Sequence, residues 1–177
     1  MPSELYAFSI PLRDLAPAVD EWRERACEAK PSHGVPPHVT LLIPAPPDLE
    51  TAAVALEPFG PFEVEFARLG RFPATLWLSP EPAEPFVRMT EALVDAFPGH
   101  LPYAGAFEQI TPHLTVAQGD DLGETETALE PRLPLRSRAS SVVLFEQVAP
   151  DRWRENDELQ LCCRSPFARR RSGTSRT

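Results

Sequence analysis

The spacing of apolar positions along the chain predicts a mixture of strands and helices. Apolar side chains that alternate with polar ones are typical of strands with one buried face, whereas apolar side chains three and four positions apart are typical of amphipathic helices. The clearest helical segment is 82–98, where Phe86, Met89, Leu93 and Phe97 follow this spacing. The predicted strands are 5–12, 38–44, 62–69, 75–79, 113–118, 139–149 and 152–163, and the predicted helices are 15–29, 48–59, 82–98 and 124–130.

The two halves of the chain repeat the same order of elements. Each half has a long helix, a loop rich in proline and glycine, a strand that opens with Pro-His-apolar-Thr-apolar, and a short acidic helix. The motif histidines, His38 and His113, are 75 residues apart. Two copies of one unit predict an α+β fold of two pseudo-symmetric lobes, each with a small, mostly antiparallel sheet, flanking a central cleft.

We expect residues 1–165 to form this single bilobal domain. The segment 166–177 is rich in arginine and has no apolar periodicity, which predicts a disordered basic tail. No stretch approaches the roughly 18 consecutive apolar residues that cross a bilayer, and the first residues lack a signal-peptide pattern. The sequence therefore predicts a cytoplasmic protein without a membrane partner, and it does not indicate the oligomeric state.

The repeated motif places two polar side chains on one face of each strand. Because side chains alternate across a strand, His38 and Thr40 project to one face while the apolar residues beside them project into the core. His113 and Thr115 do the same in the second half. Pseudo-symmetric lobes would bring the two pairs face to face across the cleft.

One such motif alone has a simpler explanation, since a histidine and a threonine on a half-buried strand are more often structural. The composition of the chain gives about 0.04 chance occurrences of His-apolar-Thr-apolar. The sequence contains two, and both follow a proline. We therefore interpret the pair as functional.

Two imidazoles and two hydroxyls suit displacement at phosphorus. Histidine titrates near pH ~6.5, so one imidazole can act as a base for the incoming oxygen while the other acts as an acid for the leaving oxygen. Threonine hydroxyls can donate hydrogen bonds to the non-bridging oxygens. A strained 2′,3′-cyclic phosphate needs no metal for this reaction. The three cysteines show no metal-ligand spacing and no GxSxG motif is present, so we expect no metal, no cofactor and no serine nucleophile.

The charge distribution limits the size of the substrate. The net charge is −9, but five arginines follow residue 163, and the chain before them carries −14. Extended nucleic-acid grooves are built from many Lys and Arg contacts, so we expect none here. The expected partner is a small nucleotide, or an RNA end, that carries a cyclic or 2′-linked phosphate.

The paired motifs resemble those of the 2H phosphoesterase superfamily, and specifically its bacterial 2′-5′ RNA ligase-like branch. The resemblance runs from about residue 5 to residue 163 and includes GVPPHVTLLIP, RLGRFPATLWLSPEP, FPGHLPYAGAF and TPHLTVAQG. It implies the bilobal fold and metal-independent chemistry on 2′-linked or cyclic phosphates. It also implies that His38 and His113 are catalytic and that Thr40 and Thr115 bind the phosphate.

The chain departs from this family at two places. Some relatives end the second motif with arginine where this chain has Gln118, and others follow the first motif with Tyr-Pro-Phe where this chain has Ile-Pro-Ala at 43–45. In the loop before the second motif, Tyr103 and Phe107 are candidates for stacking on a base at the mouth of the cleft. The alternative is that these two rings cap the core.

The predicted activity is metal-independent hydrolysis of 2′,3′-cyclic phosphates or 2′-5′ phosphodiester ends of RNA or nucleotides, with 2′-5′ ligation as the reverse reaction. The residues do not assign the acid and the base. Analogy with cyclic phosphodiesterases of the superfamily favours His113 as the group that activates water and His38 as the acid. The alternative function is a non-catalytic module of the same fold that binds a nucleotide or an RNA end.

Overall fold

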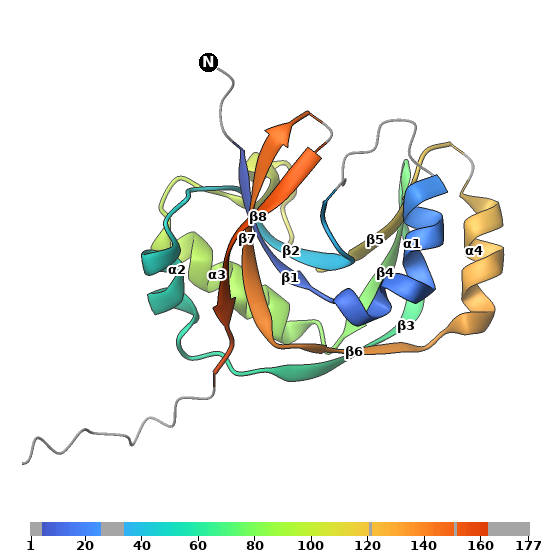
Figure 1. Ribbon diagram of the computed structural model, residues 1–177, viewed down its shortest axis with the longest axis horizontal. Coiled ribbons are helices and arrows are strands. Elements are labelled where there is room, and N and C mark those ends of the chain that lie inside the picture. The colour runs from blue at the N-terminus through green and yellow to red at the C-terminus, as the bar shows by residue number, and fades with distance from the viewer. Residues whose placement is uncertain (1–4, 26–33, 121, 151, 163–177) are drawn as a thin grey trace, which may run out of the picture.

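The computed structural model describes residues 5–25, 34–120, 122–150 and 152–162. Two four-stranded sheets form the centre of the molecule, with helices on the outside (Figure 1). The strands are β1 (Tyr6–Pro11), β2 (His38–Ala45), β3 (Phe62–Phe72), β4 (Thr75–Glu81), β5 (Leu114–Gln118), β6 (Leu135–Ala139), β7 (Ser141–Ala149) and β8 (Arg152–Gln160). The helices are α1 (Ala16–Arg25), α2 (Leu49–Leu56), α3 (Glu84–Ala96) and α4 (Gly123–Leu129), and short 3₁₀ turns are η1 (Arg13–Leu15), η2 (Pro102–Gly105) and η3 (Glu130–Arg132).

Both sheets are antiparallel and are built on the same plan. The first has the strand order β2-β1-β7-β8 and the second β5-β4-β3-β6, so each motif strand is at an edge and pairs with the strand that precedes it in the chain. The last two strands, β7 and β8, return to the first sheet beside β1. The predicted fold class, two small antiparallel sheets in a bilobal α+β molecule, is confirmed.

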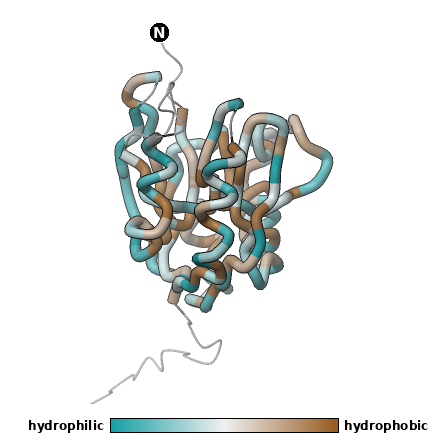
Figure 2. Tube along the Cα trace, turned by 90° about the vertical axis from the view of Figure 1, so that its right-hand side faces the viewer, coloured by the Kyte–Doolittle hydropathy of each residue, from teal (hydrophilic) through white to brown (hydrophobic). Residues whose placement is uncertain are grey.

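The helices are exchanged between the lobes. Helix α1 comes just before β2 in the chain but packs against β5, and α3 comes before β5 but packs against β2 and α2. Figure 1 accordingly shows α1 and α4 beside β3, β4 and β5, and α2 and α3 beside the other sheet. The apolar side chains of both lobes form one continuous core. Figure 2 shows that hydrophobic segments of the chain run through the middle of the molecule. The two lobes are therefore held together by shared packing.

Most elements lie where the apolar spacing predicts them, and Asp48 precedes α2 as its N-cap. The Asp48 carboxylate accepts a hydrogen bond from the Thr51 backbone N–H at 3.0 Å, which is the contact of an N-cap. Strand β6 was missed, because its inward-facing residues are Ser137 and Ala139 and give no strong apolar alternation. The predicted tail at 166–177 lies outside the described residues.

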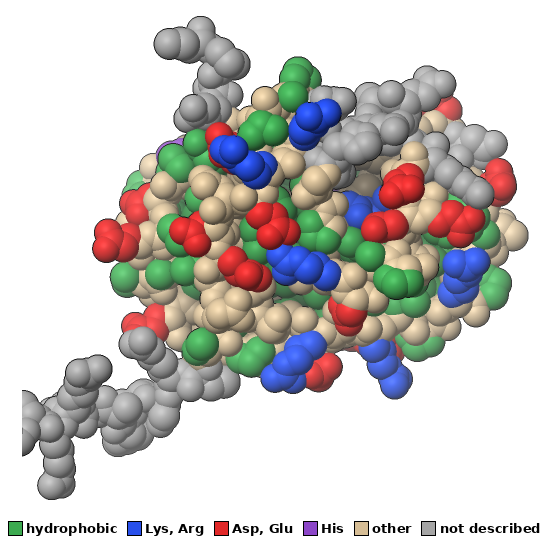
Figure 3. Space-filling view, in the orientation of Figure 1, with side chains coloured by type: hydrophobic (Ala, Val, Ile, Leu, Met, Phe, Trp, Pro, Cys, Tyr) green, Lys and Arg blue, Asp and Glu red, His purple; other side chains and the backbone are tan. Residues whose placement is uncertain are grey.

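The surface carries acidic and basic groups in alternation. On the face seen in Figure 3, Asp and Glu side chains are interspersed with fewer Lys and Arg side chains, and no continuous basic groove is visible there. Several arginines form ion pairs across strands, for example Arg136 with Glu65 at 2.7 Å and Arg154 with Glu146 at 2.6 Å. In the part of the chain that is described, no helix has the length and apolar character to span a membrane.

Candidate active site

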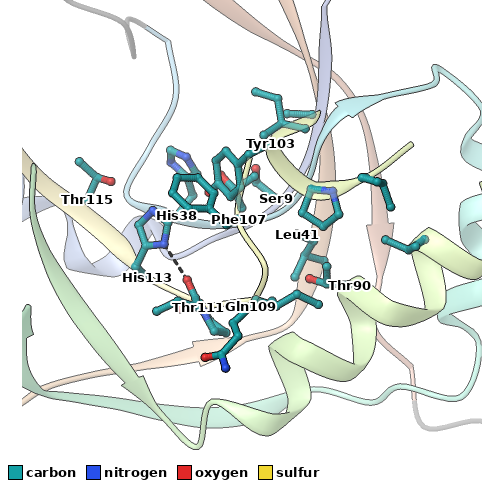
Figure 4. Close-up of a pocket in the computed structure, with 18 of the residues that line it drawn as sticks. Ser9, His38, Leu41, Thr90, Tyr103, Phe107, Gln109, Thr111, His113 and Thr115 are labelled. Atoms are coloured by element: carbon teal, nitrogen blue, oxygen red, sulfur yellow. Dashed lines mark hydrogen bonds between the residues drawn. The ribbon is translucent and has the colours of Figure 1, made fainter. Parts of the chain in front are cut away.

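The predicted site residues line one cleft of about 730 Å³ between the lobes. His38 and Thr40 reach it from β2, and His113 and Thr115 reach it from β5 and the residue before it. All four side chains are partly exposed, whereas the intervening Val39, Leu114 and Val116 are buried in the core: the motif strands have one face in the cleft and one in the interior. Figure 4 shows the imidazoles of His38 and His113 facing the same space.

Both imidazoles are fixed by the same local contact. His38 Nδ1 lies 2.8 Å from the Pro36 carbonyl oxygen, and His113 Nδ1 lies 2.8 Å from the Thr111 carbonyl oxygen. The second of these bonds is drawn in Figure 4. A carbonyl can only accept, so Nδ1 must be the protonated nitrogen in each ring. In the neutral form this leaves the Nε2 lone pair of each ring free to accept a proton.

The site favours the neutral form of both histidines when no ligand is bound. Burial is the main cause that lowers the pKa of His38 to about 4; the Pro36 hydrogen bond opposes it, and the nearby charges of Arg23 and His113 add to it. Burial likewise lowers the pKa of His113 below its usual value. The charged form of a buried imidazole loses its hydration without gaining a counter-charge, which explains both directions.

Arg23 hydrogen-bonds to the backbone segment 35–36, which also accepts the hydrogen bond from His38. Its guanidinium donates to the Val35 carbonyl at 2.9 Å and to the Pro36 carbonyl at 3.3 Å, and it pairs with Asp20 at 2.6 Å. The Pro36 oxygen thus accepts from both Arg23 and His38. The Arg23 side chain is only 12% exposed, so this contact lies out of bulk water. Sequence patterning does not indicate this role, because Arg23 is one of several charged residues on a predicted helix.

Aromatic rings surround His113 on the second lobe. The centroid of its ring lies 5.2 Å from that of Phe72, 6.0 Å from that of Trp77 and 6.1 Å from that of Tyr103, whose ring is nearly parallel at 23°. Gly70 allows Trp77 to lie flat across β3, because a Cβ at that position would be 2.3 Å from the indole. The cleft is thus aromatic on the His113 side.

The loop residues Tyr103 and Phe107 line the cleft, and with exposures of 36% and 61% neither ring caps the core. The Tyr103 hydroxyl hydrogen-bonds to Thr40, and its ring is 5.5 Å from Phe107. Tyr103 and Ala104 both have left-handed backbone conformations, with φ of 52° and 55°. Such strain in non-glycine residues is concentrated at ligand-binding segments. Their role in stacking on a base stays a prediction.

A model of the 2′-5′ RNA ligase superfamily matches residues 11–151, which include both motifs. The chain belongs to the 2′-5′ RNA ligase superfamily. The resemblance seen in the paired motifs is confirmed by this match, and membership is consistent with a phosphoesterase activity. No curated protein matches the sequence.

Several solved structures share the fold of this chain. Escherichia coli LigT in apo form superposes with a TM-score of 0.60 and 15% identity, covering 90% of this superfamily member and 98% of LigT. LigT complexed with 3′-AMP gives a TM-score of 0.57 and 17% identity, covering 89% of this chain and 98% of that one. The protein TT0787 of Thermus thermophilus gives 0.59 and 19%, covering 89% and 97%. Identities this low show a shared fold alone.

This superfamily member has a third hydroxyl beside the motif threonines. Ser9 of β1 lies directly opposite Thr40 of β2 in the sheet, so the two side chains are neighbours on the cleft face. Ser9 is 1% exposed, and among the described residues its hydroxyl has no hydrogen-bond partner. The position opposite Thr115 in the other lobe is Trp77. The cross-strand neighbour is therefore a hydroxyl at Thr40 and an indole ring at Thr115.

The superfamily member lacks a basic side chain at the described part of the cleft wall. Gln118 lines the cleft, and none of the described residues that line it is lysine or arginine. Arg71, on the nearby β3, pairs with Glu126. Over the described ranges, no group of three or more His, Cys, Asp or Glu side chains is placed to hold a metal ion. The described side-chain donors for a phosphate here are therefore hydroxyl groups, the amides of Gln109 and Gln118, the indole of Trp153 and a protonated imidazole.

Proposed function

We propose that this protein is a metal-independent phosphoesterase that hydrolyses 2′,3′-cyclic phosphates, or 2′-5′ phosphodiester ends, of nucleotides or RNA. The observation that carries the proposal is the matched pair of imidazoles, each with Nδ1 tied to a carbonyl two residues earlier and each facing one cleft beside a threonine hydroxyl. This arrangement supplies a base, an acid and donors for the non-bridging oxygens.

The reaction needs one neutral and one protonated histidine. A bound phosphate anion favours the charged form of a nearby imidazole and so raises its pKa, which provides the proton that the free site lacks. The neutral histidine takes a proton from water through Nε2 while the water oxygen attacks phosphorus. The protonated histidine gives its proton to the leaving ribose oxygen, and the P–O bond of the ring breaks.

The charge of Arg23 bears on which histidine has which role. Burial disfavours protonation of both rings and lowers the pKa of each, and at His38 the charge of Arg23 adds to this effect. We therefore assign His38 as the base that activates water and His113 as the acid, the reverse of the assignment by analogy. In the ligation direction the two roles exchange.

The substrate is a small nucleotide or a chain end. LigT, which shares the fold, has been solved with 3′-AMP and with NADP+. A cleft of about 730 Å³ without a described lysine or arginine suits a ligand with few phosphates. Thr40, Thr115 and Ser9 bind the non-bridging oxygens, and Tyr103 and Phe107 offer faces for a base.

The test is hydrolysis of nucleoside 2′,3′-cyclic phosphates in EDTA, with the product isomer identified. We expect one monophosphate isomer, and a fall of at least ~10² in kcat for His38→Ala and for His113→Ala. His100→Gln is the matched control, because His100 lies outside the cleft and packs against Phe97. Wild-type hydrolysis by a variant that lacks both His38 and His113 would refute the proposal. Saturable binding without product would instead favour a nucleotide-binding module.

A further inference from the structure

One wall of the cleft belongs to helix α3 and has no part in the chemistry proposed above. Thr90, Glu91, Val94 and Asp95 line the cleft from this helix, at the spacing of a single helical face. Figure 4 shows Thr90 projecting from α3 on the side of the cleft occupied by Leu41. Glu108 lines the cleft from the loop that carries Tyr103.

The Thr90 side chain lies at the base of this wall and lines the cleft. Thr90 is 2% exposed, and within the described chain its hydroxyl has no hydrogen-bond partner. A threonine inside a helix commonly bonds back to the carbonyl four residues earlier. Thr127 of α4 does so, with its hydroxyl 2.9 Å from the Gly123 carbonyl oxygen. Thr90 has no such bond to a described residue, so its donor and acceptor capacity is available to a ligand in the cleft.

The negative charge of this wall determines which chemical groups of a ligand can bind there. Glu91 and Asp95 are exposed carboxylates that line the cleft beside Thr90, one helical turn apart on α3. Ionised carboxylates only accept hydrogen bonds, so they favour O–H and N–H donors. They repel a second phosphate, and the described part of the cleft has no Lys or Arg to offset that repulsion.

We propose that Thr90, Glu91 and Asp95 form a subsite for the unphosphorylated, hydrogen-bond-donating end of the substrate. The reacting phosphate lies at the two histidines and a free hydroxyl or amine lies against α3, so the cleft selects compounds with a single phosphate. This inference rests on the proposed function for the position of the phosphate. It adds that a nucleoside 2′,3′-cyclic phosphate with a free 5′-hydroxyl is preferred to one with a 5′-phosphate.

The kinetic test compares adenosine 2′,3′-cyclic phosphate bearing a 5′-hydroxyl, a 5′-amine or a 5′-phosphate. We expect kcat/KM for the hydroxyl form to exceed that for the 5′-phosphate form by at least ~10-fold. The double variant Glu91→Gln/Asp95→Asn should reduce this ratio to below about 3 by improving the 5′-phosphate form, since it removes both charges at nearly constant shape. A still higher kcat/KM for the amine form would identify an ammonium group as the preferred donor, and equality with the hydroxyl form would identify a neutral one.

Two further variants separate this subsite from general effects. Thr90→Val keeps the shape of the side chain and removes the hydroxyl, so we expect KM for the hydroxyl form to rise by about 3- to 10-fold with kcat unchanged. Glu84→Gln is the matched control, because Glu84 is on the same helix but outside the cleft, beside Arg88 at 3.8 Å. Equal kcat/KM for the 5′-hydroxyl and 5′-phosphate forms in the wild type, or an equal response to Glu84→Gln, would overturn the proposal.

A binding measurement distinguishes failure of the subsite from failure of the catalytic assignment. Calorimetry with adenosine 3′-monophosphate and adenosine 3′,5′-bisphosphate requires no turnover. Tighter binding of the monophosphate that is lost in Glu91→Gln/Asp95→Asn supports the subsite, even if no cyclic phosphate is hydrolysed. Hydrolysis with equal binding of the two nucleotides keeps the proposed function and refutes the subsite.

Discussion

The pKa of His38 measures how strongly its surroundings disfavour the protonated ring. Burial lowers the pKa of this imidazole to about 4 in the folded protein, whereas in an unfolded chain it titrates near 6.5. Between these two values the folded protein binds fewer protons at His38 than the unfolded chain does. The contribution of His38 to stability is therefore complete above pH 6.5 and is lost as the pH falls toward 4.

The magnitude follows from the size of the pKa change. The fall from 6.5 to about 4 corresponds to about 3 kcal/mol of unfolding free energy at full protonation, and about 2 kcal/mol of this is lost by pH ~5. These values are upper bounds, because the ring keeps some contact with water in the cleft. Glutamine at this position does not titrate, so wild type and His38→Gln should respond differently to acid.

Urea unfolding of the two proteins between about pH 7.5 and pH 5 measures this effect. We expect the unfolding free energy of wild type to fall by up to about 2 kcal/mol more than that of His38→Gln over this range. NMR titration of the four histidine rings gives the pKa directly, with the His38 signal assigned by its absence in the variant. A free-energy difference that is constant with pH, together with a midpoint near 6.5, would refute the claim that burial controls this imidazole.

Three other changes test separate contacts of the site. Arg23→Gln removes the guanidinium donor to the Pro36 carbonyl, so kcat should fall by about 10-fold. Because the Arg23 charge lowers the pKa of His38, the acidic limb of the kcat/KM profile should also move to higher pH. An unshifted limb would contradict this. Gly70→Ala places a Cβ against the Trp77 ring, so thermal unfolding should show that the unfolding free energy falls by about 1–3 kcal/mol. The same variant should have a lower kcat. Thr40→Val removes a phosphate donor, for which we expect a fall in kcat of about 10²-fold, and unchanged single-turnover rates would exclude that role.

The parts of the site that could be predicted are those encoded within a few residues of each other. The alternation of side chains along a strand is enough to place His38 beside Thr40, and repetition of the motif indicated the second pair. Ser9 could not be found in this way, because its proximity to Thr40 depends on the register between β1 and β2. Register is fixed by the packing of both strands, and no short motif reports it.

The same distinction explains the other residues that were missed. Arg23 acts on His38 only because the end of α1 comes close to the loop at 35–36, a contact that periodicity does not reveal. Thr90 lies in a helix with regular apolar spacing, and the sequence does not indicate that its side chain lines the cleft. The fold class followed from the repeat, but the exchange of helices between the lobes did not, because it is a property of how the chain crosses from one sheet to the other.

The exchanged helices and the returning strands β7 and β8 have a consequence for folding. Strand β1 pairs with β7 across some 140 residues of chain, and the cleft takes Phe145 from β7 and Trp153 from β8. A ribosome must therefore release nearly the whole chain before the first lobe can close, and pairings this distant in sequence are expected to make folding slow. For the same reason, a protein split between the two motifs would yield two fragments that each lack part of their own sheet or its covering helix. The two histidines belong to a sequence repeat, but the sheets and helices that position them are complete only when one uninterrupted chain folds.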